Sequence, residues 1–275
     1  MTKVATPPYP HAPLTLVAVE ARFPTAGDEL PSVAERRSIR DALGEDWVMT
    51  DATSTELEFS SDRPQPSIRQ VPAVRFVTRD LMVAVTLRPA SLVVETTNYP
   101  GYTAFREVVR RAATAVDAAS RPDGVTRLGL RYIDEIIVPG MRDAPFSAWN
   151  EWLSGDILPP RPKQLADLGL EQSAWNGQAS YQLAANRVLQ LRWGYSPAPL
   201  VAEPPGGLRQ PRALINEPRV FMDFDCAWTP EDLPAFSAAN LMKECDTLHA
   251  PMCGLFESLI TERLRTEIFG QGEPA

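Results

Sequence analysis

The stretch Val125-Thr126-Arg127-Leu128-Gly129-Leu130-Arg131-Tyr132-Ile133-Asp134-Glu135-Ile136-Ile137-Val138 decides the fold class. Apolar and polar side chains alternate along most of it, which is typical of a long β-strand with one buried face. The buried face is predicted to hold Leu128, Leu130, Tyr132, Ile136 and Val138. The other face is predicted to hold Arg127, Gly129, Arg131, Ile133 and Glu135. A strand of this kind belongs to an antiparallel sheet with a layer packed against one side.

Further strands and two long helices are predicted on both sides of this stretch. The earlier strands cover 14–23, 74–78, 81–87 and 92–97. The later strands cover 178–183, 187–195 and 219–228. Apolar residues at spacings of three and four predict helices over 102–119 and over about 238–269. Pro251 is expected to kink the second helix or to restart it.

This order of elements predicts an α+β fold, with an antiparallel sheet or sheets covered on one face by long helices. An alternative is a helix-grip-like arrangement, in which the sheet wraps around the last helix. We divide the chain into an extended Pro-rich tail (1–13) and two α+β halves (14–145 and 146–275). The second half contains a Pro-rich loop over 196–218. The sequence leaves open whether the halves are topologically similar and whether they pack as one domain.

The composition limits the class of protein. The 275 residues are 44% hydrophobic and 23% charged, which is ordinary for a globular chain and unlike a disordered one. The net charge of −8 disfavours a protein that coats nucleic acid. No apolar run approaches the ~18 residues of a membrane helix, and the first residues do not resemble a signal peptide. We therefore expect a cytoplasmic protein with no membrane partner and with reduced cysteines.

Three segments together resemble a sporadically distributed bacterial family of uncharacterised proteins. The first is Pro13-Leu14 with Val17, Glu20, Arg22 and Phe23. The second is Arg127-Leu128-Gly129-Leu130-Arg131-Tyr132-Ile133-Asp134, where family members often have Asn in place of Asp134. The third is Leu248-His249 with Phe256-Glu257-Ser258 and Thr261. The segments span nearly the whole chain. The resemblance implies no particular reaction, but the patchy distribution implies an accessory or conflict gene system.

The first candidate site is a network of charged residues in the first two of these segments. If the strands over 14–23 and 125–138 are neighbours, Glu20 can meet Arg127 or Arg131 across the sheet. With Arg22 and Asp134, these residues could form an anion-binding site or a structural ladder of ion pairs. We favour the structural interpretation. A buried pair of Arg131 with Glu20 predicts a loss of about 3–5 kcal/mol for Arg131→Ala.

Two further constellations have functional and structural interpretations. Asp223 and Asp225 share one face of a predicted strand, where paired carboxylates could bind Mg²⁺ or act as acid and base. Two aspartates opposite a core face usually mark a solvated strand face, and we favour that structural interpretation. Cys245, His249 and Cys253 follow at helical spacing and are a weak zinc candidate, because a tetrahedral site needs a fourth ligand. We predict no metal and no cofactor.

The motifs that usually mark catalysis are missing from the sequence: GxGxxG after a strand, GxxxxGK[ST], GxSxG and HExxH. The leading expectation is a non-enzymatic binding or regulatory protein with a protein partner; homo-oligomers remain open. A first alternative is a small-ligand carrier with a cavity lined by Trp175, Tyr181, Trp193 and Tyr195. A second is an Asp/Glu/Arg-based or metal-dependent enzyme that uses Asp223 with Asp225, or Glu20 with Arg131.

Overall fold

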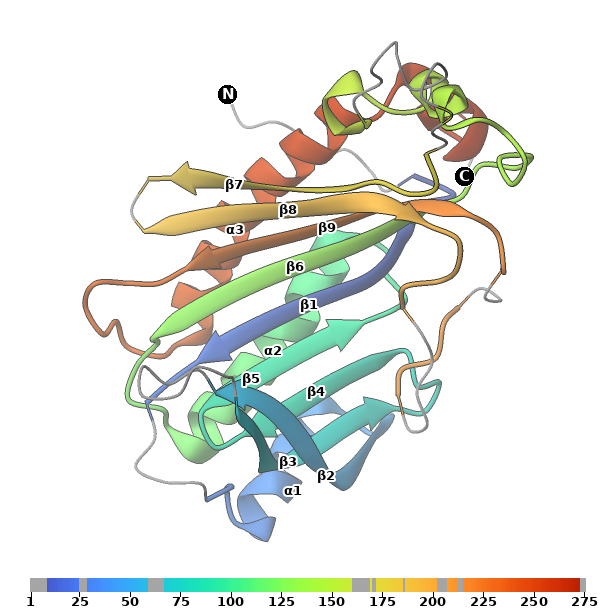
Figure 1. Ribbon diagram of the computed structural model, residues 1–275. Helices are drawn as coiled ribbons and strands as arrows, with labels where there is room; N and C mark the ends of the chain where they lie inside the picture. The colour runs from blue at the N-terminus through green and yellow to red at the C-terminus, as the bar shows by residue number, and fades with distance from the viewer. Residues whose placement is uncertain are drawn as a thin grey trace.

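The computed structural model of the chain describes residues 9–24, 29–58, 67–159, 169, 172–184, 186–201, 207–211 and 215–272. Residues 1–8 of the predicted tail, and 202–206 and 212–214 of the Pro-rich loop, lie outside this description. The described residues form a nine-stranded antiparallel sheet and three α-helices (Figure 1). The expected mixed class with an antiparallel sheet is therefore confirmed.

The nine strands are β1 (Leu14–Arg22), β2 (Trp47–Glu58), β3 (Ser67–Thr78), β4 (Val83–Arg88), β5 (Ser91–Thr96), β6 (Arg127–Ile136), β7 (Asn176–Leu183), β8 (Arg187–Ser196) and β9 (Arg219–Trp228). The α-helices are α1 (Val33–Leu43), α2 (Tyr102–Ser120) and α3 (Ala238–Leu259). Three short helical turns are η1 (Phe146–Glu151), η2 (Gly155–Ile157) and η3 (Leu264–Ile268).

Strands β1 and β6 are neighbours at the centre of the sheet, and the other strands continue outward from them in a mirrored order. Beside β1 lie β5, β4, β3 and β2, and beside β6 lie β9, β8 and β7. In each half of the sheet, β1–β5 and β6–β9, the first strand is central and the last strand pairs with it, so β6 belongs with the strands after residue 145 although it precedes the expected boundary. A long helix then follows, α2 after β5 and α3 after β9. One continuous sheet thus runs through both halves.

The core lies on one face of this sheet, because alternate residues of the central strands are apolar and buried. The register aligns Val17 of β1 with Tyr132 of β6, and Val19 with Leu130. The buried side chains of α2 are Phe105, Val109, Ala112, Ala113, Ala115 and Val116. Those of α3 are Leu241, Met242, Cys245, Leu248, Met252 and Leu259. Figure 1 shows α2 and α3 behind the central strands in this view.

Helix α1 and strand β2 occupy a region for which the sequence predicted no element. The helix begins with a capping box, in which the Ser32 hydroxyl accepts a hydrogen bond from the Glu35 amide and the Glu35 carboxylate accepts one from the Ser32 amide. Its apolar pattern is short, since only Ile39 and Leu43 are buried. Strand β2 lies at the sheet edge and is rich in polar residues, so it lacks the alternation that marks a half-buried strand.

Helix α3 is one continuous helix that contains Pro251, so the restart considered at this proline does not occur. The helical region expected to reach residue 269 ends at Leu259, and the separate turn η3 follows. The Ser237 side chain caps α3 by accepting a hydrogen bond from the Asn240 amide. None of the helices in the described part of the chain is long and apolar enough to cross a membrane.

The Pro-rich loop leaves β8, reaches the far half of the sheet and returns to β9 (Figure 1). Its position there is fixed by backbone contacts. The Arg209 amide donates to the Leu81 carbonyl at 2.7 Å, and the Thr97 hydroxyl donates to the Arg209 carbonyl at 2.5 Å. The Gln210 side chain donates to the Thr15 carbonyl of β1 at 3.5 Å. The loop therefore joins the two halves of the sheet.

Candidate functional site

The sheet face that points away from α2 and α3, here called the open face, carries a stripe of charged side chains across five strands. The stripe consists of Arg88 on β4, Glu20 and Arg22 on β1, Arg127 and Arg131 on β6, Asp223 and Asp225 on β9, and Arg192 on β8. With five guanidinium groups and three carboxylates, it has a positive charge in a chain whose net charge is −8.

Glu20 is the centre of one part of the stripe. Its carboxylate accepts hydrogen bonds from Arg22 Nε and Arg127 Nη1, both at 3.0 Å, and lies 3.5 Å from Arg88 Nη1. Arg127 also reaches Asp225, at 3.6 Å. A Cβ atom at Gly129 would lie 2.7 Å from Arg127 Nη1. Glycine thus gives the Arg127 guanidinium room to lie over the strand and join the two carboxylates.

Asp223 is the centre of the second part. Arg131 donates to its two oxygens at 2.7 and 2.8 Å, and Arg192 donates at 2.5 Å. The Asp223 side chain is only 9% exposed, whereas those of Arg131 and Arg192 are 43% and 50% exposed. The hydrogen bonds to Asp223 outweigh burial and raise the pKa of the Arg131 guanidinium. Two accessible cations therefore cover one buried anion.

This arrangement corrects the expected pairing of Arg131 with Glu20. The register places Arg131 opposite Ala18 of β1 and opposite Asp225 of β9. Two carboxylates therefore lie diagonal to Arg131, Glu20 on β1 and Asp223 on β9. The Arg131 side chain binds Asp223. Glu20 is instead occupied by the arginines beside it.

Asp134, which the sequence grouped with this network, lies on the opposite face of the sheet. The register pairs it with Met222 of β9, among side chains that face the helices. Asp134 is 5% exposed. Burial, together with the negative charge of Asp223, raises the pKa of this carboxyl to about 8. Asp134 is therefore a protonated side chain of the interior and not a member of the stripe.

A cluster of polar side chains surrounds His249 on the helix side of the sheet. His249 Nδ1 lies 3.0 Å from the Tyr132 hydroxyl, which in turn lies 3.2 Å from that of Tyr99. The ring of Tyr102 stacks on the imidazole with centroids 3.7 Å apart. Burial lowers the pKa of His249 to about 4, so the ring is neutral at neutral pH.

The sulfur of Cys253 lies 3.4 Å from His249 Nε2, and burial raises the pKa of this thiol to about 11. A neutral thiol beside a neutral imidazole is the reverse of an activated thiolate–imidazolium pair. Cys245 is buried, and burial raises its pKa to about 12. No group of three His, Cys, Asp or Glu side chains in the described ranges could hold a metal ion, and this includes the candidate trio.

The four aromatic residues considered for a ligand cavity have different surroundings. Trp175 and Tyr195 stack at 5.3 Å, and Phe146 packs against the edges of both rings. Trp193 lies over Gly177, where a Cβ atom would clash with its ring. Tyr181 is 42% exposed. These contacts place Trp175 and Tyr195 in one cluster, with Trp193 and Tyr181 at separate positions.

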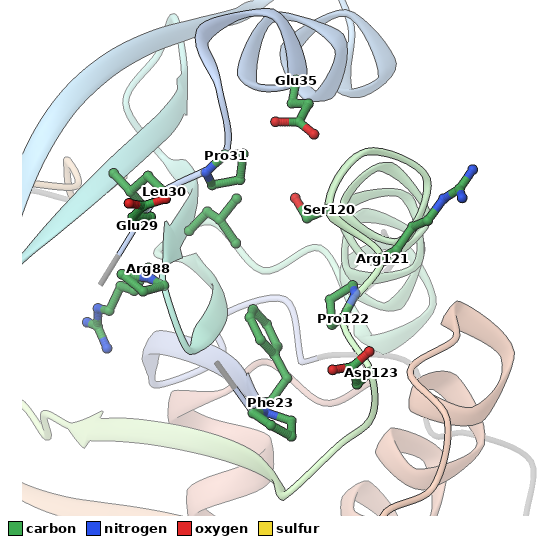
Figure 2. Close-up of a pocket in the computed structure, with 13 residues that line it drawn as sticks. Phe23, Glu29, Leu30, Pro31, Glu35, Arg88, Ser120, Arg121, Pro122 and Asp123 are labelled. Atoms are coloured by element: carbon green, nitrogen blue, oxygen red, sulfur yellow. The ribbon is translucent and has the colours of Figure 1, made fainter. Parts of the chain in front are cut away.

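Two cavities lie elsewhere. One, of ≈ 300 Å³, lies between the start of α1 and the end of α2, with Glu35, Ser120 and Asp123 among its lining residues (Figure 2). Glu35 is engaged in the capping box described above. The second, of ≈ 390 Å³, lies between the open face and the Pro-rich loop.

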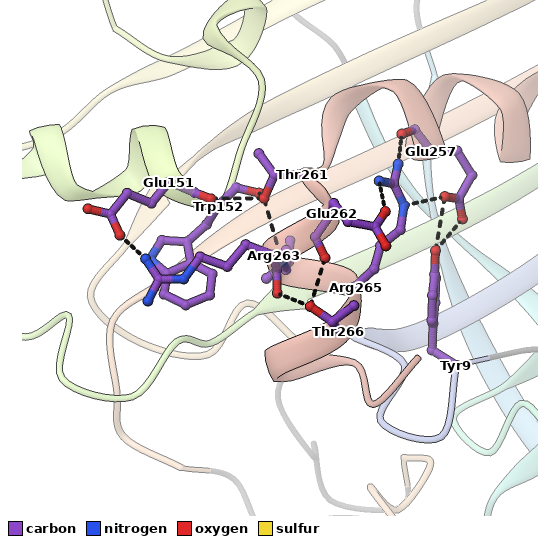
Figure 3. A network of polar contacts seen from close by, with 10 residues as sticks. Tyr9, Glu151, Trp152, Glu257, Thr261, Glu262, Arg263, Arg265 and Thr266 are labelled. Carbon is purple, nitrogen blue, oxygen red and sulfur yellow. Dashed lines mark hydrogen bonds and ion pairs between the residues drawn. The ribbon is translucent and has the colours of Figure 1, made fainter. Parts of the chain in front are cut away.

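The third sequence segment has a structural explanation. Glu257 accepts hydrogen bonds from the Tyr9 hydroxyl and from Arg265 Nε, and the Thr261 hydroxyl donates to the backbone of Glu151 and Trp152 (Figure 3). These contacts attach the end of α3 to the N-terminal strand region and to the η1 turn. These contacts give a structural role to Glu257 and Thr261, two of the polar residues that define the third segment.

Two members of the stripe, Arg88 and Arg192, were not among the predicted site residues. Arg192 could have been found from strand alternation, because it lies between the buried Leu191 and the half-buried Trp193. Arg88 lies one residue beyond the strand predicted over 81–87. The sequence does not indicate the carboxylate partner of either arginine, because the partner depends on which strands are neighbours in the sheet.

Comparison with known proteins adds no assignment. No family model matches the chain, and no curated protein matches it. The functional conclusion therefore depends on the geometry of the site.

Proposed function

We propose that the protein is a non-enzymatic intracellular binding protein and that the charged stripe on its open face contacts a partner protein. In this proposal α2 and α3 cover the other face of the sheet, which leaves the open face to the partner. The observation that carries the proposal is the half-exposure of Arg131 and Arg192 around the buried Asp223. Their guanidinium groups are held in place and still present donors to solvent.

The order of charges favours a polypeptide over a nucleic acid as the partner. From Arg88 through Glu20, Arg127 and Asp225, the sign alternates along the chain of contacts. A phosphate backbone is uniformly negative and would meet the carboxylates of the stripe as well as its arginines. A protein surface with acidic and basic side chains can complement both signs, and such complementarity selects partners more than it adds affinity.

The ionisation of the candidate catalytic groups supports a binding role. Cys253 and His249 are both neutral at neutral pH, so the thiol lacks the charge of a nucleophile. Both oxygens of Asp223 already accept hydrogen bonds from arginines, so the carboxylate is occupied within the protein. The resemblance of the Arg127–Asp134 segment to a family of accessory genes is part of the same proposal.

A site-specific photocrosslinking experiment tests this function. A photoreactive residue at Gln190, which is exposed on the open face beside Asp225, should capture a discrete polypeptide in the cells that make the protein. The same residue at Thr114, exposed on α2, is the matched control and should not. The partner, once purified, should bind at least about ten-fold more weakly to the Arg131→Glu/Arg192→Glu variant, with an affinity that falls as salt rises.

Two outcomes would contradict the proposal. Identical adducts from positions 190 and 114 would show that the open face has no specific partner. Unchanged affinity of the purified partner for the charge-reversed variant would show that the stripe is not the contact surface.

A further inference from the structure

Strand β7 forms one edge of the sheet, with β8 on its inner side and none of the described strands on its outer side (Figure 1). Its sequence, Asn-Gly-Gln-Ala-Ser-Tyr-Gln-Leu, contains no charged residue and no proline. Its register with β8 is continuous from Asn176 to Leu183, so the strand has no bulge. Charges, prolines and bulges are the devices by which edge strands avoid pairing with other chains, and β7 has none of them.

The opposite edge of the sheet differs from β7 in its charge. Strand β2 contains the acidic residues Asp51, Glu56 and Glu58. Two copies of β2 placed side by side would bring like charges together, whereas two copies of β7 meet without repulsion. Of the two edges, β7 is therefore the one that suits a second copy of the chain.

The hydrogen bonds between β7 and β8 identify the backbone groups that point outward. The Tyr195 amide donates to the Trp175 carbonyl at 2.9 Å, one residue before β7 begins. In an antiparallel pair, the hydrogen-bonded positions recur at every second residue. The odd-numbered residues of β7 therefore bind β8 through their backbone. The even-numbered residues direct their amides and carbonyls away from the sheet: Asn176, Gln178, Ser180 and Gln182.

The side chains of β7 are accessible on both faces of the sheet. Ser180 is exposed and lies opposite Gln190, on the open face. Tyr181 is 42% exposed and lies opposite the buried Leu189, on the face toward the helices. The described part of the chain therefore covers this edge on neither face, and an added strand has room to pair with it.

Strand β7 is complementary to a second copy of itself. An antiparallel pair with its two-fold axis at Ala179 places Gln178 opposite Ser180 of the second copy, so that outward-pointing backbone groups meet. On the other face, Tyr181 then lies opposite Gly177 of the second copy. Trp193 already lies over Gly177 in its own chain, so the incoming tyrosine ring meets an indole. Pairing thus buries an aromatic side chain that the single chain exposes.

We propose that two copies of the chain pair through β7, antiparallel about a two-fold axis at Ala179, and form one continuous sheet. The axis is perpendicular to the sheet, so the open faces of both copies lie on the same side. The contact is smaller than a standard protein interface, and we expect a dissociation constant of roughly 10–100 µM. The pairing does not depend on the partner-binding role of the stripe.

Sedimentation velocity of the full-length protein, from about 5 to about 500 µM, tests the pairing. The wild type should shift from monomer toward dimer over this range. Gln178→Lys/Ser180→Lys places lysine opposite lysine twice and should weaken the dimer at least about ten-fold. Gln178→Lys/Ser180→Glu places each lysine opposite a glutamate and should keep the dimer within about three-fold of the wild type, or tighten it.

A matched control separates this effect from that of net charge. Thr114→Lys/Ala118→Lys adds two lysines at exposed positions of α2 and should leave the dimer unchanged. Circular dichroism establishes that each variant is folded. The substituted side chains of β7 are exposed, so the lysine variants are expected to fold.

A cysteine at position 179 tests the register. Residues opposite each other at a non-hydrogen-bonded position have Cα atoms about 4.5 Å apart, a separation that a disulfide spans. In a Cys253→Ser background, Ala179→Cys should form a disulfide-linked dimer on mild oxidation. Ser180→Cys should not, because its two copies lie diagonally, about 7–8 Å apart.

Three results would overturn the proposal. A monomer at every concentration up to about 500 µM would leave the edge to a strand of a different protein. Equal dimerisation of the wild type and the folded Lys/Lys variant would place the contact on another surface. Equal weakening by Lys/Lys and Lys/Glu, without cross-linking at position 179, would exclude the two-fold pairing at Ala179.

Discussion

Arg131 and Asp223 form two parallel hydrogen bonds, of 2.7 and 2.8 Å, although the register of β6 and β9 places Arg131 directly opposite Asp225. The pair is therefore diagonal, and it leaves a free side of Asp223 for Arg192. This shared carboxylate determines how the stripe responds to mutation.

The first prediction concerns the two arginines that share Asp223. Arg131→Ala should cost only about 1 kcal/mol, because Arg192 still neutralises Asp223 and the lost side chain is 43% exposed. This is less than the 3–5 kcal/mol predicted for a buried pair with Glu20. Arg131→Ala/Arg192→Ala leaves a carboxylate that is 9% exposed without a counter-ion, and should cost about 3 kcal/mol or more. Urea unfolding of the double-mutant cycle measures the difference, and additive losses would contradict the shared carboxylate.

The second prediction concerns the fully buried ion pair of Glu135 and Arg219, whose side chains are 2% and 3% exposed. Arg219 also donates to the carbonyls of Ile215 and Glu217, so it anchors the end of the Pro-rich loop that returns to β9. Arg219→Met should cost about 3–5 kcal/mol by leaving Glu135 charged and unpaired. Hydrogen exchange should then quicken at the Leu200 and Val201 amides, which Glu135 binds.

Arg142→Met provides the control for this second prediction, because it removes a 52% exposed arginine that pairs with Glu217 near the same loop. It should leave stability within about 0.5 kcal/mol of the wild type. A similar loss of stability in both variants would mean that the buried ion pair of Glu135 and Arg219 contributes no more to stability than an exposed one.

The third prediction is a pH dependence that originates at Asp134. Its pKa is about 8 in the folded protein and near 3.8 when unfolded. Between these values the folded state holds a proton that the unfolded state has released, so the contribution of Asp134 to stability falls as pH rises from about 4 to about 8. Asp134→Asn has no such proton. Its stability relative to the wild type, from urea unfolding at pH 4, 6 and 8, should increase at each step. A constant difference would show that Asp134 is ionised in the folded protein.

The fourth prediction concerns the reactivity of Cys253. Cys226 and Cys245 are buried, so Cys253 should be the thiol that iodoacetamide modifies in the native protein. With a pKa of about 11, it should react roughly 100-fold more slowly at pH 7 than free cysteine, and faster as pH rises. Mass spectrometry of the wild type and Cys253→Ser measures the rate and its assignment. Modification as fast as that of free cysteine would identify an activated thiol and would favour an enzyme.

The local alternation of apolar and polar residues was sufficient to predict many of the strands and the two long helices. The alternation along β6 placed Leu128, Leu130 and Tyr132 on the buried face, where the structure has them. It was insufficient for β2, an edge strand whose polar residues do not alternate with apolar ones. Helix α1 was missed because only Ile39 and Leu43 are buried, too few to create a helical pattern.

The candidate site was predicted less completely, because its partners come from strands that are distant in the sequence. Glu20 and Arg127 were grouped correctly once β1 and β6 were assumed to be neighbours. The partner of Arg131 could not be found in this way, since it required the additional knowledge that β9 is the other neighbour of β6. Alternation along β6 places Asp134 on the same face as Leu130 and Tyr132, opposite to the arginines. Grouping Asp134 with the arginines ignored this pattern.

The central position of β1 has a consequence for synthesis of the chain. Its neighbour β5 ends at Thr96, and α2 ends at Ser120, so the first half of the sheet can form before β6 is made. Until residues 127–136 emerge from the ribosome, the inner edge of β1 has no strand to pair with it. An unpaired edge on a growing chain invites pairing with other nascent chains. The interval between translation of α2 and of β6, only a few residues long, keeps that exposure brief.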